Sequence, residues 1–183
     1  MIPGLDRFRE NFRGLEASYL LIGGAATHLV LDEAGLAFRA TKDLDIVLCV
    51  EALDDAFVAA FWSFVALGGY EHREAGTAPR RYYRFQRPSD PAFPMMLELF
   101  SRRIDGVAVP DHARLTPIPT GEDLSSLSAI LLDDEIYAWL LDGRRTIAEV
   151  PIIGAPHLIA LKARAIAARP ASGQGRTPGP CVQ

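Results

Sequence analysis

The sequence has little of what marks secreted, membrane-spanning or strongly charged proteins. Its two cysteines among 183 residues cannot form a disulfide framework, which favours a reduced cytosol. The most apolar segment, residues 56–67, is too short to span a bilayer. The first ten residues carry four charged side chains, which is not typical of a signal peptide. We therefore expect a cytoplasmic protein with no membrane partner.

Charge and histidine content give no support to two further classes. The net charge of −4 gives no overall attraction to nucleic acid or to anionic lipid. The four histidines are scattered along the chain, so they do not indicate the histidine-rich metal site of many phosphohydrolases. The 49% hydrophobic and 23% charged residues fit one globular domain, which we place at residues 1–168. Residues 169–183 are rich in glycine and proline and are expected to be disordered.

Two neighbouring segments carry the main chemical signal. Tyr19–Ile22 is a short apolar run that predicts a buried strand, and Gly23 with Gly24 ends it in a sharp turn. A helix is expected over Ala25–Ala34. A glycine turn that precedes a helix is a common phosphate-binding device.

A strand is expected at residues 41–48, and it carries two carboxylates. Because side chains alternate across a strand, Asp43 and Asp45 share one face, about 6–7 Å apart at the backbone. Leu44 and Ile46 then share the opposite, core-facing side. Two like charges at this separation repel each other, and a cation bound between them would offset the repulsion. Carboxylate oxygens are ligands that suit Mg²⁺. The alternative is an edge strand that points both aspartates into water.

The rest of the chain predicts alternating helices and strands. We expect helices at residues 3–13, 52–67, 134–141 and 157–168, strands at 80–87, 95–100 and 146–153, a loop at 70–78, and a hairpin turn at Asp105–Gly106. Residues 124–132 fit either a strand or a short helix. In the strand at 95–100, Glu98 points away from Leu97 and Leu99, so it lies exposed or meets a metal held by the two aspartates.

These residues together resemble a known superfamily. The order of strand, Gly23-Gly24, helix and Arg39-x-Thr41-Lys42-Asp43-x-Asp45 resembles the DNA polymerase beta-type nucleotidyltransferases. The chain is most similar to small bacterial members related to abortive-infection toxins, over about residues 15–165. The resemblance implies an α/β (α+β) fold with a mixed β-sheet and helices packed mainly on one face.

The resemblance also implies a metal site and a substrate site. Asp43, Asp45 and Glu98, as the third carboxylate, would bind two Mg²⁺ ions, or Mn²⁺ in their place. Gly23 and Gly24 would hold a nucleoside triphosphate. Further substrate-binding candidates are Arg39, Thr41, Lys42 and Lys162, of which Lys162 would contact phosphates. Lys42 and Lys162 are each equally compatible with a solvated surface position.

The implied activity is transfer of a nucleoside monophosphate from a triphosphate to an acceptor hydroxyl. The acceptor stays open between RNA such as a tRNA end, a protein and a small molecule. Two departures from the family weigh against activity. Ala25 offers no hydroxyl where members often carry serine or threonine, and residues 169–183 stand in place of a charged helical segment. A second hypothesis is therefore a catalytically degenerate domain that binds a partner, for example in a toxin–antitoxin pair.

Overall fold

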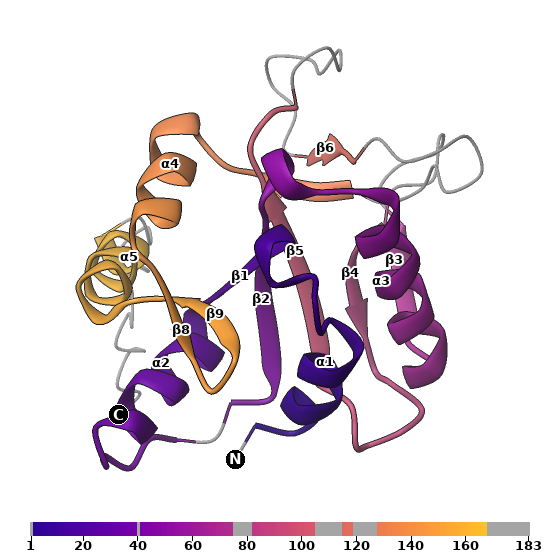
Figure 1. Ribbon diagram of the computed structural model, residues 1–183, viewed down its shortest axis with the longest axis horizontal. Helices are drawn as coiled ribbons and strands as arrows, with labels where there is room; N and C mark the ends of the chain where they lie inside the picture. The colour runs from indigo at the N-terminus through magenta and orange to yellow at the C-terminus, as the bar shows by residue number, and fades with distance from the viewer. Residues whose placement is uncertain (1, 40, 75–81, 105–114, 119–127, 168–183) are drawn as a thin grey trace, which may run out of the picture.

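A computed structural model describes residues 2–39, 41–74, 82–104, 115–118 and 128–167 (Figure 1). The tail expected at residues 169–183 and the turn expected at Asp105–Gly106 lie outside these ranges. Among the residues described, no helix combines the length and the apolar character that crossing a bilayer would require.

The centre of the fold is a mixed β-sheet. Its main path runs in the order β3–β4–β5–β2–β1–β9–β8. These strands are β1 (Tyr19–Ile22), β2 (Asp43–Leu48), β3 (Glu71–Glu74), β4 (Tyr82–Gln86), β5 (Met96–Ser101), β8 (Arg144–Ile147) and β9 (Val150–Ile153). Off this path, β6 (Leu115–Pro117) pairs with β7 (Ser128–Leu131), and β7 also pairs with β5. β2 is parallel to β5 and antiparallel to β1. The chain is thus a mixed α/β protein.

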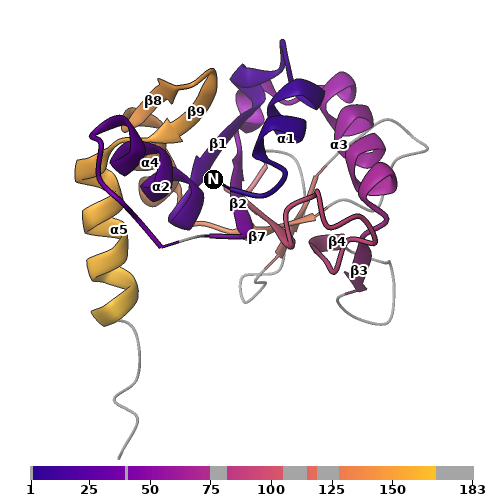
Figure 2. The same ribbon diagram turned by 90° about the horizontal axis from the view of Figure 1, so that it is seen from below.

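The helices fall into two groups. α1 (Leu5–Asn11) and α3 (Asp55–Gly68) lie on the same face of the sheet (Figure 2). α2 (Gly23–Glu33), α4 (Asp134–Asp142) and α5 (Ala155–Ala167) gather around the end of the sheet formed by β9 and β8 (Figure 1). Two short 3₁₀ turns, Glu16–Ser18 and Val50–Ala52, connect β1 and β2 to the elements beside them.

The core explains which way β2 faces. Leu44, Ile46 and Leu48 are fully buried, as the alternating pattern predicts. Aromatic side chains of the first helix group fill this side of the sheet; Phe8 on α1, for example, meets Phe64 on α3 with ring centroids 5.5 Å apart. Each such buried side chain contributes about 1.5–3 kcal/mol. The core therefore fixes the orientation of the strand and turns its two aspartates to the opposite face.

Two of the expected elements are wrong and one ambiguity is settled. The loop expected at residues 70–78 contains β3, a polar strand that pairs with β4 at the edge of the sheet. The single strand expected at residues 146–153 is a hairpin of β8 and β9. Its two turn residues, Ala148 and Glu149, both have positive φ. Asparagine and glycine usually occupy such turn positions, and neither is present here. Residues 128–131 of the undecided segment form a strand.

Candidate functional site

Two of the three predicted carboxylates lie in a row across the sheet. Asp45 on β2 is the register partner of Glu98 on β5, and Glu98 is in turn the partner of Arg84 on β4. Register partners on neighbouring strands share one face, so these three side chains stand side by side. We call Asp43, Asp45 and Glu98 the carboxylate group. Their meeting depends on strand pairing, and the sequence alone does not specify it.

Glu98 is buried and paired with a cation from the protein itself. The residue is only 9% exposed, so the exposed position considered for it is wrong. The Arg84 guanidinium donates hydrogen bonds to Glu98 Oε1 through Nε and Nη2. This ion pair offsets the cost of burying the carboxylate. The basic character of β4 was visible in the sequence, but this pairing was not.

The glycine turn lies directly against the carboxylate group. Gly23 has φ of +64°, and a Cβ atom there would lie 2.0 Å from Asp45 Oδ2, so only glycine fits. A Cβ atom on Gly24 would lie 2.6 Å from Thr41 Oγ1. The backbone N–H of Gly24 also donates a hydrogen bond to Asp45. The two halves of the sequence motif are therefore in contact, and α2 begins at Gly23 rather than at Ala25 as expected.

Asp45 is electrostatically strained in this position. Burial, followed by the negative charges of Glu98 and Asp43, raises its pKa to about 6. The Arg84 charge and the Gly24 hydrogen bond lower the pKa but do not cancel this effect. A carboxylate beside two others, with insufficient compensation from the protein, would gain stability from an additional cation.

A cleft of about 200 Å³ beside this turn brings together most of the predicted substrate-binding residues. Its lining comprises Gly23, Gly24, Thr27, Phe38, Arg39, Thr41, Leu158, Leu161 and Lys162. Lys42 is exposed and does not line the cleft, as expected for a solvated lysine. Lys162 lines the cleft from α5, more than one hundred residues away along the chain, and its side chain is exposed, as its solvated-surface alternative predicts.

Sequence reasoning missed Phe38 as part of this cleft. The Lys162 Nζ atom lies 5.4 Å from the centroid of the Phe38 ring, which is a cation–π contact. No sequence signal distinguishes Phe38, because a single aromatic residue in a connecting segment has no periodic pattern. Phe38 and Lys162 both line the cleft, so this contact forms part of its wall.

The oxygen donors of the site are of the kind that binds a divalent cation, but the side chains do not form a complete set of metal ligands. Asp43 and Asp45 offer the hard oxygen ligands that Mg²⁺ prefers. Within the ranges that the structure describes, no three histidine, cysteine, aspartate or glutamate side chains converge as a metal-binding group. Glu98 would have to exchange Arg84 for a metal in order to serve as the third ligand.

Comparisons with protein-family models, with curated proteins and with solved structures found no match. The functional argument therefore rests on the residues and their geometry.

Proposed function

We propose that this protein is a metal-dependent nucleotidyltransferase with the fold of the DNA polymerase beta type. The observation that carries the proposal is the contact between the glycine turn and the carboxylate group. A Cβ atom at Gly23 would collide with Asp45 Oδ2. A phosphate at the start of α2 would thus lie beside the carboxylates that bind metal.

Each part of the site has a role in this reaction. The backbone at Gly23 and Gly24, at the start of α2, binds phosphate oxygens, for which the Gly24 N–H exchanges Asp45 for the phosphate. Ile22 at the N-cap position offers no side chain that would compete for them. Lys162 and Arg39 line the same cleft and add positive charge toward the triphosphate. Asp43, Asp45 and Glu98 would hold the two Mg²⁺ ions.

When bound, the metal ions supply the charge that activates the acceptor hydroxyl and stabilises the leaving pyrophosphate. The protein contributes position. β2 and β5 hold Asp45 and Glu98 in register, and the tight fit at Gly23 fixes the turn relative to both strands. Positioning and charge stabilisation are what phosphoryl-type transfer chiefly requires from a protein.

A transfer assay tests the proposal. Each nucleoside triphosphate, labelled on its α-phosphate, is incubated with the protein, Mg²⁺ or Mn²⁺, and RNA, protein or small-molecule acceptors. We expect labelled product from one triphosphate, lost in Asp45→Asn and Glu98→Gln and retained in Glu10→Gln, which neutralises an exposed carboxylate on α1. Absence of incorporation into every acceptor by the folded wild type would count against transfer.

One observation favours the second candidate, a degenerate domain that binds a partner. Arg84 already neutralises Glu98, the position at which the third metal ligand is proposed. In a domain without catalysis, this ion pair would be a permanent part of the sheet. The two candidates differ in divalent-metal binding, which a degenerate domain lacks.

A further inference from the structure

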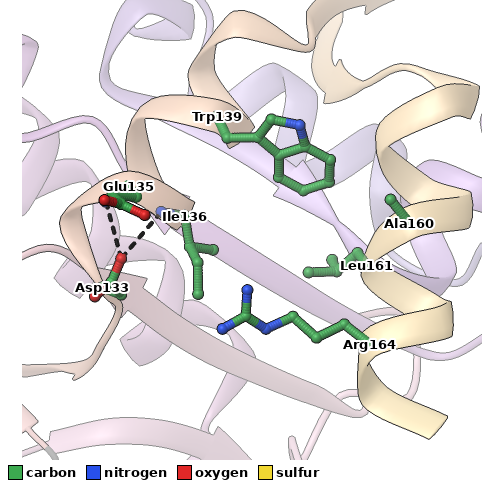
Figure 3. Close-up of a pocket in the computed structure, with 7 residues that line it drawn as sticks. All are labelled: Asp133, Glu135, Ile136, Trp139, Ala160, Leu161 and Arg164. Atoms are coloured by element: carbon green, nitrogen blue, oxygen red, sulfur yellow. Dashed lines mark hydrogen bonds between the residues drawn. The ribbon is translucent and has the colours of Figure 1, made fainter. Parts of the chain in front are cut away.

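A second pocket, of about 560 Å³, lies between α4 and α5 (Figure 3). This volume is in the range of sites that enclose small organic ligands. Leu161 lines both this pocket and the cleft at the glycine turn, so the two hollows adjoin around α5. Among the described residues that line this pocket, the others do not belong to the site described above.

An aromatic ring forms one wall of this pocket. Trp139 on α4 is held by His157 on α5, with ring centroids 4.5 Å apart. A Cβ atom at Gly143 would lie 2.4 Å from His157 Cγ, so the glycine makes room for this packing. The tryptophan is thereby positioned in advance of any ligand, which lowers the entropic cost of stacking a ring against it.

Charged groups of opposite sign occupy the two sides of the pocket. Arg164 extends from α5 toward the start of α4 (Figure 3) and forms no ion pair with any residue in the described ranges. Asp133 and Glu135 stand on the α4 side. Asp133 Oδ1 accepts hydrogen bonds from the backbone N–H groups of Glu135 and Ile136, at 3.0 and 3.4 Å, so its carboxylate is fixed as the helix N-cap.

This lining selects among classes of ligand. A purely apolar molecule could pack on Trp139 but would make no use of the Arg164 guanidinium or the Glu135 carboxylate. A polyphosphate would face two carboxylates, and a polyamine would face Arg164. A neutral, planar ring with hydrogen-bond donors on one edge and acceptors on another matches all three features, because it can stack on Trp139 and pair with both sides.

We propose that the pocket between α4 and α5 binds a nucleobase. The base stacks on Trp139, Arg164 donates to its carbonyl or ring-nitrogen acceptors, and Glu135 accepts from its amino or imino group. The site goes beyond the proposed transfer reaction, because it requires neither phosphate nor metal. The base would lie in the pocket that adjoins, around α5, the cleft in which the glycine turn binds phosphate.

The test is a titration of the protein with adenosine, guanosine, cytidine, uridine and ribose in the absence of divalent metal. Binding is followed by calorimetry and by tryptophan fluorescence. We expect at least one nucleoside to bind and to change the fluorescence, and ribose to do neither. Because nucleosides carry no phosphate, failure here is distinguishable from failure of metal-dependent triphosphate binding.

Variants assign the binding to this pocket. Trp139→Leu should weaken nucleoside binding at least about tenfold and abolish the fluorescence change, although Trp62 remains. Arg164→Gln, at an exposed position where folding is not at risk, should weaken binding several-fold. Arg87→Gln is the matched control, since Arg87 is exposed and pairs with Glu71. The proposal is overturned if no nucleoside binds at millimolar concentration, or if both pocket variants bind as the wild type does.

Discussion

Asp45→Asn should stabilise the metal-free protein at neutral and alkaline pH. The substitution keeps the size of the side chain and an oxygen that can accept the Gly24 hydrogen bond, and it removes the negative charge. In the wild type, that charge is partly buried beside the charges of Glu98 and Asp43. The charge therefore destabilises the folded state.

The magnitude follows from the pKa of Asp45. Its value is raised from 3.8 to about 6 in the folded protein, so the folded state binds this proton more tightly than the unfolded chain does. The wild type therefore loses stability as the pH rises through this interval, and the loss is complete above about pH 6. A shift of about two units corresponds to at most about 3 kcal/mol, or roughly 6–12 °C in Tm for a domain of this size.

Urea unfolding measured from pH 4 to pH 8 checks this prediction. Asp45→Asn should match the wild type near pH 4 and exceed its free energy of unfolding increasingly up to pH 6. Glu10→Gln, which neutralises an exposed carboxylate, should follow the wild type throughout. A difference that does not change with pH, or a variant less stable than the wild type at pH 8, would refute the assigned strain.

Three further substitutions test separate contacts. Gly23→Ala should destabilise the fold by at least about 1–2 kcal/mol in urea unfolding, because its φ of +64° disfavours a side chain and a carboxylate oxygen occupies the Cβ position. Arg84→Gln should raise the affinity for Mn²⁺ roughly tenfold, measured by calorimetry, because Glu98 loses its internal counter-ion. An unchanged or weaker affinity would show that Glu98 is not a ligand. Tyr137→Phe should lower the free energy of unfolding by about 1–3 kcal/mol, because the Tyr137 hydroxyl donates a hydrogen bond to Glu51 at 2.6 Å. A Tm equal to that of the wild type would contradict this prediction.

The strands that carry the site were predictable because their patterns are local. Alternation of apolar and charged residues places the two aspartates of β2 on one face and Leu44 and Ile46 on the other, as the structure confirms. A buried strand at Tyr19–Ile22 and a strand with a single glutamate at Met96–Ser101 follow from the same kind of pattern. Each depends only on residues that are close together in the chain.

The features that escaped prediction depend on distant pairing or on unusual local conformations. Nothing in the sequence of β4 states that Arg84 will stand opposite Glu98, since register arises from packing of the whole sheet. The turn between β8 and β9 uses alanine and glutamate at positive φ, against their preference, so it carries no turn signal. All four residues of β3 are polar, so no apolar alternation signals this strand, and its pairing with β4 is not local to the sequence.

Metal-dependent triphosphate binding tests the central claim most directly. The wild type and Asp43→Asn/Asp45→Asn are titrated by calorimetry with each of the four nucleoside triphosphates, with and without Mg²⁺. The proposed function predicts that the wild type binds at least one triphosphate only when Mg²⁺ is present, and that the folded double variant loses this binding. A wild type that binds no triphosphate, or a double variant that binds equally well, would contradict the assignment of the carboxylate group as a metal and nucleotide site.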